Sequence, residues 1–159
     1  MPWTNTIFCM TATETPNPGP EDRPLTVLVA EDHESVRSMA VMILEHLGYR
    51  VLQAGSGTEA LKIWEDQPEG VDLLFTDLQM PGMTGLELAA ALEAKKPGLK
   101  ILFTSGSGSH AVETMLSSRQ RLHFLPKPYT PAFLAAAINK SLGDGVPGHE
   151  GSSGFDLAR

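Results

Sequence analysis

The sequence LLFTDLQMPGMTGLEL, residues 73–88, combines three local signals that decide the fold. A continuous apolar run ends in Thr76 and Asp77, the turn residues Pro81 and Gly82 follow, and a helical pattern begins after them. An aspartate at the end of a strand often does no more than start a turn. It can also be a nucleophile displayed at the edge of a sheet, and the residues that follow the other strands discriminate between these two roles.

Short apolar runs alternate with helical patterns through the central part of the chain. The apolar runs predict strands at 25–30, 49–54, 71–76, 100–104 and 122–125. The helical patterns predict helices from Glu34 to Gly48, from Ser56, from Thr84 to Pro97, over 108–120 and from Thr130. Apolar runs without polar alternation are typical of strands covered on both faces. Five strands alternating with five helices therefore predict an α/β fold, a doubly wound parallel sheet with right-handed crossovers.

Local signals also predict the starts and the buried faces of several helices. Ser56 with Glu59, and Thr84 with Glu87, match the capping-box pattern, and Thr130 precedes a proline at the first helical position. Helical spacing predicts buried side chains at Val36, Met39, Ala40, Ile43 and Leu47 in the first helix and at Phe133, Leu134, Ala137 and Ile138 in the last.

Composition excludes several classes of protein. The chain has 159 residues, enough for one domain with a core, and its net charge of -7 argues against a general nucleic-acid binder. A single cysteine, Cys9, allows no disulfide framework. No apolar run approaches the length of a membrane span, and the N-terminus lacks the features of a signal peptide. We therefore expect a cytoplasmic protein with no membrane contact, in which a flexible Pro-rich arm (1–24) and a flexible Gly-rich tail (143–159) flank a domain over 25–142.

Polar side chains follow four of the predicted strands. Glu31 and Asp32 follow the first strand, Asp77 follows the third, Thr104 ends the fourth and Lys127 follows the fifth. In a parallel sheet these ends meet at one edge, where ligands bind. Three carboxylates at one place repel one another unless a cation lies among them, and oxygen ligands suit Mg²⁺. Lysine and threonine can hold phosphoryl oxygens, so the set favours phosphoryl transfer to a carboxylate, which needs no separate base.

Four segments resemble the receiver domain of two-component response regulators. They are VLVAEDHESVR (27–37), LLFTDLQMPGMTGLEL (73–88), ILFTSG (101–106) and FLPKPY (124–129), and the resemblance covers about 25–142. The phrases ILFTSG and FLPKPY are especially similar to receivers fused to hybrid histidine kinases. The resemblance implies a flavodoxin-like fold with strand order 2-1-3-4-5.

The resemblance also implies roles for individual residues. Asp77 would be the phospho-acceptor, Thr104 the switch hydroxyl, Phe124 the switch aromatic, and Lys127 the phosphate-binding lysine before a cis peptide bond to Pro128. The Mg²⁺ ligands would be Glu31, Asp32, Asp77 and the backbone carbonyl of Gln79. Glu31 replaces the commoner aspartate, and Phe124 lacks the hydroxyl of the frequent tyrosine.

By the same resemblance, the function would be phosphorelay signalling. The chain would take a phosphoryl group from phosphohistidine on a sensor histidine kinase or a histidine phosphotransfer protein, switch conformation, and signal to a downstream protein. It would catalyse only its own phosphorylation and dephosphorylation. An alternative within the class is a receiver fragment of a hybrid histidine kinase that acts as a relay or a phosphate sink.

Three other classes of function compete with this interpretation. GSGTEA (55–60) fits a dinucleotide-binding pattern after a strand, but such a domain would leave Glu31, Thr104 and Lys127 without a purpose. Phosphohydrolases with an aspartyl-phosphate intermediate commonly carry a second aspartate two residues after the nucleophile, where this chain has Gln79. A non-catalytic adaptor would be favoured only if an acidic-pocket residue were missing.

Overall fold

The computed structural model describes residues 23–68, 70–106 and 123–143. The predicted helix over 108–120, and all but the inner ends of the predicted arm and tail, lie outside these residues. The strands are β1 (Thr26–Ala30), β2 (Arg50–Ala54), β3 (Leu73–Asp77), β4 (Lys100–Ser105) and β5 (His123–Pro126). The helices are α1 (Glu34–His46), α2 (Gly57–Asp66), α3 (Gly85–Lys95) and α5 (Pro131–Gly143).

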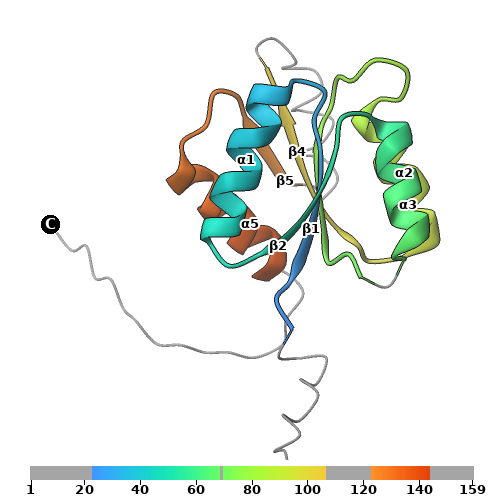
Figure 1. Cartoon of the computed structure of the whole chain (residues 1–159), viewed down its shortest axis with the longest axis horizontal. Helices are drawn as coiled ribbons and strands as arrows, with labels where there is room; N and C mark the ends of the chain where they lie inside the picture. The colour runs from blue at the N-terminus through green and yellow to red at the C-terminus, as the bar shows by residue number, and fades with distance from the viewer. Residues whose placement is uncertain (1–22, 69, 107–122, 144–159) are drawn as a thin grey trace, which may run out of the picture.

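The strands form one parallel sheet in the order β2-β1-β3-β4-β5, which confirms the predicted flavodoxin-like topology. Helices α1 and α5 cover one face of the sheet, and α2 and α3 cover the other (Figure 1). The predicted strands differ from the observed ones by one or two residues at their ends. The difference that concerns the site is in β3, which extends through Asp77.

Two hydrophobic clusters fill the layers on either side of the sheet. Val27 and Val29 of β1 belong to the cluster beneath α1 and α5, whereas Leu28 and Ala30 belong to the cluster beneath α2 and α3. Successive side chains of a strand point to opposite faces, so a strand buried on both faces must be apolar throughout. This is why the central strands appear in the sequence as uninterrupted apolar runs.

The predicted buried faces of α1 and α5 are partly wrong. In α1 the fully buried side chains are Ala40 and Leu44, whereas Met39 is 37% exposed. Leu47 lies beyond the last turn of α1 and is 43% exposed, and Phe133 of α5 is 65% exposed. Apolar residues occupy several faces of α1, so spacing alone does not select the face that contacts the sheet. In α5 the same holds for Phe133, while Leu134 and Ile138 are buried as predicted.

The capping box of α3 is complete, and that of α2 is half formed. The Glu87 N–H donates to Thr84 Oγ1 (3.2 Å) and the Thr84 N–H donates to Glu87 Oε2 (2.8 Å). The bond from the Thr84 N–H, and after it the bond that the Thr84 hydroxyl donates to the same Glu87 Oε2 (2.9 Å), lower the pKa of Glu87. In α2 the Glu59 N–H donates to Ser56 Oγ (3.1 Å), but the Glu59 carboxylate accepts from Gly55 instead (2.7 Å). Both caps fix the direction in which each helix leaves the carboxyl edge of the sheet.

Candidate functional site

The carboxyl ends of β1, β3 and β4 bring polar side chains together at one edge of the sheet. Asp77 of β3 lies opposite Thr104 of β4 in the parallel register, and Glu31 follows the last residue of β1. All three residues are buried, with exposed fractions of 5%, 1% and 3% respectively. Burial of polar groups at this position is costly unless they are paired.

Lys127, just beyond β5, connects two of the buried carboxylates. Its Nζ donates to Glu31 Oε2 (2.5 Å) and to Asp77 Oδ2 (2.8 Å). Burial on its own lowers the pKa of Lys127, but the hydrogen bonds to Asp77 and Glu31 and the negative charges of these two carboxylates together outweigh it and raise the pKa overall. The lysine therefore stays charged and neutralises one of the negative charges at this edge.

The negative charge that remains makes the site suited to a divalent cation. Glu31, Asp32 and Asp77 supply three carboxylates against the single ammonium of Lys127. Asp32 Oδ1 is buried and makes no hydrogen bond within the described part of the chain. Oxygen donors with excess negative charge and an unsatisfied buried oxygen fit Mg²⁺, which accepts carboxylate and carbonyl ligands and retains waters. Gln79 lies beside this set, because its N–H donates to Asp77 Oδ1 (3.0 Å).

Thr104 lies beside the buried carboxylates, whereas Phe124 lies further from them. The Thr104 hydroxyl is buried and has no hydrogen-bond partner among residues 23–68, 70–106 and 123–143. Phe124 is half-buried and packs against the cluster beneath α2 and α3, opposite Phe103 of β4. Thr104 is thus beside Asp77 with unused hydrogen-bonding capacity, whereas Phe124 lies one strand further away.

Gly85 allows the first turn of α3 to approach the end of β3 very closely. A Cβ at Gly85 would lie 2.0 Å from the Asp77 carbonyl oxygen. The Gly85 N–H donates to the Leu78 carbonyl (3.1 Å), and the Leu78 N–H donates to the Thr104 carbonyl (2.9 Å). These contacts hold the backbone that carries the Asp77 carboxylate. Sequence reasoning did not single out Gly85, although a glycine at the first position of a capped helix is a usable signal of close approach.

Sequence reasoning also missed two other residues at this edge. Arg37 of α1 donates from Nη1 to the backbone carbonyl of Glu31 (2.8 Å), which holds the turn after β1. Tyr129 is buried, and its ring packs edge-on against Phe75 at 6.0 Å. Burial, followed by the charges of Glu31 and Asp77, raises the pKa of Tyr129 to about 12. In the sequence, only the position of Tyr129 directly after Lys127 and Pro128 indicated that it lies near this edge.

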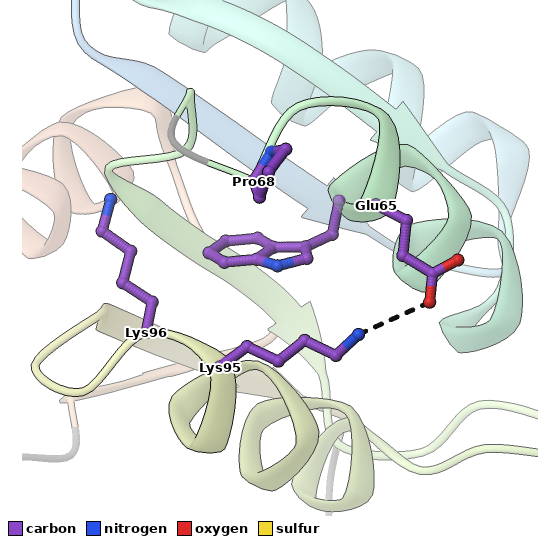
Figure 2. A pocket seen from close by; sticks show the side chains of 5 residues that line it. Glu65, Pro68, Lys95 and Lys96 are labelled. Carbon is purple, nitrogen blue, oxygen red and sulfur yellow. Dashed lines mark hydrogen bonds and ion pairs between the residues drawn. The ribbon is translucent and has the colours of Figure 1, made fainter.

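Two other features resemble ligand sites. A pocket of about 270 Å³ lies between the C-terminal ends of α2 and α3, at the opposite edge of the sheet, and is lined by Trp64, Glu65, Pro68, Lys95 and Lys96 (Figure 2). Its lysines are engaged, since Lys95 pairs with Glu65 (3.4 Å) and Lys96 donates to the Val71 carbonyl (2.8 Å).

The GSGTEA turn after β2 does not have the character of a dinucleotide site. The carboxylate of Glu59 accepts the Gly55 N–H, so an anionic side chain occupies the turn that a pyrophosphate would need. A Cβ at Gly57 would lie 2.9 Å from the Met83 side chain, which explains the second glycine by packing. Within the described residues, no helix combines the length and apolar character needed to cross a membrane.

The chain is similar in sequence to known proteins of bacterial signalling. The chain is 38% identical over 117 residues to the sensor kinase CckA of Brucella abortus, covering 74% of this chain but 12% of that protein. It is 34% identical over 116 residues to the response regulator receiver protein CpdR of Brucella abortus, covering 73% of this chain and 95% of that protein. The chain therefore spans a small part of one relative and nearly all of the other.

Solved receiver domains share the fold. The crystal structure of the receiver domain from the hybrid histidine kinase CckA superposes with a TM-score of 0.62 at 32% identity, covering 74% of this chain and 98% of that one. Residues 27–139 match the family described as response regulator receiver domain. This chain belongs to the response regulator receiver domain family and is a phospho-accepting receiver of two-component signalling.

Proposed function

We propose that Asp77 is the residue that accepts the phosphoryl group. Its carboxylate lies at the carboxyl edge of the sheet, with one oxygen bound by Lys127 and the other by the Gln79 N–H. The observation that carries the proposal is the buried pairing of Asp77 with Lys127 beside two further carboxylates, Glu31 and Asp32. A carboxylate held in this way is oriented for attack and needs no separate base.

The residues around Asp77 have distinct parts in the transfer. An Asp77 carboxylate oxygen forms a bond to phosphorus while the phosphorus–nitrogen bond of phosphohistidine breaks, and the electron pair returns to the imidazole nitrogen. Lys127 and the Thr104 hydroxyl are placed to hold phosphoryl oxygens. When bound, Mg²⁺ supplies positive charge that offsets the charge of the transferring group. Its ligands would be Glu31, Asp32, Asp77 and the backbone carbonyl of Gln79.

We propose a histidine kinase or a histidine phosphotransfer protein as the donor, acting in the cytoplasm. Receiver domains take phosphate from such proteins. Exposed apolar side chains on α1 and α5, namely Met39, Met42 and Phe133, offer a contact surface on the two helices that start at the phosphorylated edge. The reaction is confined to the chain's own phosphorylation and slow dephosphorylation, and no nucleic acid is involved. A relay role within a larger kinase fits the same chemistry.

Phosphorylation by a small donor tests the proposed function directly. Incubation with acetyl phosphate and Mg²⁺ is expected to add one phosphoryl group, seen by intact-protein mass spectrometry and located by peptide mapping at Asp77. The label should be lost on treatment with hydroxylamine, which cleaves acyl phosphates but not phosphoserine or phosphothreonine. Omission of Mg²⁺ should slow the labelling strongly. A label that resists hydroxylamine, or no label at all, would contradict the proposal.

Thr104→Ala is expected to separate phosphorylation from the conformational response. The buried Thr104 hydroxyl has no partner in the described structure, so it is free to turn toward a phosphoryl oxygen. We propose that this movement makes room for Phe124 to turn inward, which changes the surface around β5. The variant should keep acetyl-phosphate labelling but lose most of the backbone NMR shift changes at Phe124 and Leu125. Equal shift changes in Thr104→Ala and wild type would show that the coupling does not pass through Thr104.

A further inference from the structure

His33 follows Glu31 and Asp32 in the sequence and carries an imidazole, whose ring nitrogens can bind metals. We propose that His33 coordinates a bound cation through its imidazole, so that the pocket binds borderline divalent cations such as Co²⁺ more tightly than Mg²⁺. This inference rests on the proposed function to the extent that the same pocket holds the cation.

The spacing of three ligand atoms supports direct coordination by His33. One ring nitrogen of His33 and one carboxylate oxygen each from Glu31 and Asp32 all lie within 4.8 Å of one another. His33 Nδ1 is 3.2 Å from Asp32 Oδ1 and 3.4 Å from Glu31 Oε1. Neighbouring ligands of a metal with bonds of about 2.1 Å lie about 3 Å apart in an octahedral shell, and slightly further apart in a tetrahedral one. The observed separations are therefore those of adjacent ligands.

Lys127 leaves this group of atoms free for a cation. It binds Glu31 through Oε2 and Asp77 through Oδ2, and it forms no hydrogen bond to Glu31 Oε1 or Asp32 Oδ1 in the described part of the chain. Asp32 Oδ1 is buried and, among the described residues, accepts no hydrogen bond although His33 Nδ1 is close to it. The two atoms lie 3.2 Å apart without a hydrogen bond between them, a separation that a cation bound by both would satisfy.

The position of His33 in the chain explains why its ring faces the carboxylates. His33 is the N-cap of α1, yet its side chain makes no capping hydrogen bond. Its backbone N–H donates to Glu31 Oε1 (3.1 Å), which ties the turn to the carboxylate. The side chain is 70% exposed, so water has access to the remaining coordination positions.

Ligand type predicts the direction of the selectivity. Mg²⁺ prefers oxygen ligands and gains little from an imidazole, whereas Co²⁺, Ni²⁺ and Zn²⁺ bind imidazole nitrogen well. Removal of His33 should therefore weaken Co²⁺ binding much more than Mg²⁺ binding. A residue that only shaped the turn would change both affinities by the same factor.

Isothermal titration of the full chain with Co²⁺ and with Mg²⁺ tests the proposal. His33→Ala is expected to raise the Co²⁺ dissociation constant by about tenfold or more, and the Mg²⁺ constant by less than about twofold. The matched control is His46→Ala, which removes an exposed histidine at the opposite end of α1 and should change neither constant. Equal changes for the two metals in His33→Ala, no change for Co²⁺, or the same Co²⁺ loss in His46→Ala would overturn the proposal.

A second measurement separates this inference from the proposed function. Wild type and His46→Ala should both be labelled by acetyl phosphate with Mg²⁺, because the oxygen ligands are intact in both. Labelling in both proteins, together with a Co²⁺ selectivity that is the same in His33→Ala as in wild type, would overturn only the role of His33. Absence of labelling in wild type would overturn the proposed function, while a selective loss of Co²⁺ affinity in His33→Ala would still support the metal ligand.

Discussion

Asp77→Asn is expected to reduce labelling by acetyl phosphate to background. The substitution replaces the attacking carboxylate with an amide, which is a very poor nucleophile at neutral pH. Asparagine has nearly the same shape, and its amide oxygen can still accept the Gln79 N–H that now reaches Asp77 Oδ1 at 3.0 Å. The loss should therefore come from chemistry and not from displacement of the loop. Intact-protein mass spectrometry over a time course measures it.

The interpretation of Asp77→Asn depends on a folded protein. Lys127 would keep its hydrogen bond to Glu31 Oε2, so its charge remains paired after Asp77 is replaced. We expect the circular dichroism spectrum to be unchanged and the melting temperature to shift little. Asp66→Asn, at the exposed end of α2, is the matched control and should be labelled like wild type. Labelling of Asp77→Asn at the wild-type rate would rule out Asp77 as the acceptor.

The parallel sheet and the grouping of the polar residues at one edge could both be predicted from the sequence, and for the same physical reason. A parallel sheet with helices on both faces requires apolar strands, and it places every strand end at one edge. Asp77 and Thr104 therefore come to lie opposite each other in register, although 27 positions separate them in the chain. Lys127 reaches the same edge from β5, which makes its contacts to Glu31 and Asp77 a consequence of topology.

The orientation of side chains was harder to predict from the sequence, because it depends on contacts between distant segments. Met39 and Phe133 fit an apolar stripe by spacing, yet the sheet contacts Ala40 and Leu134 beside them. Arg37 looks like an ordinary helix-surface cation until its bond to the Glu31 carbonyl is seen. The predicted strand order followed from the family resemblance, whereas the rotation of each helix about its own axis is set by packing volumes that no local pattern encodes.

Gly85→Ala is expected to destabilise the fold by about 3 kcal/mol or more, at the upper end of the range for overpacking. The added Cβ would lie 2.0 Å from the Asp77 carbonyl oxygen, 2.9 Å from the carbonyl carbon and 3.1 Å from Leu78 Cα. All three atoms are backbone, so the clash is relieved only by moving α3 away from β3 or by moving the end of β3 that carries Asp77. The variant should therefore also be labelled more slowly by acetyl phosphate. Urea unfolding and a labelling time course measure the two effects.

Gly57→Ala is a matched control, because Gly57 and Gly85 are both the first residue of a capped helix. Alanine is favoured over glycine in helices by about 1 kcal/mol, and this gain is common to both variants. At Gly57 the new Cβ would meet the Met83 side chain at 2.9 Å, and an unbranched, flexible side chain can move aside. The free energy of unfolding should therefore fall much less in Gly57→Ala than in Gly85→Ala. Equal losses in the two variants would mean that the close contact with the Asp77 carbonyl is not what requires glycine at the start of α3.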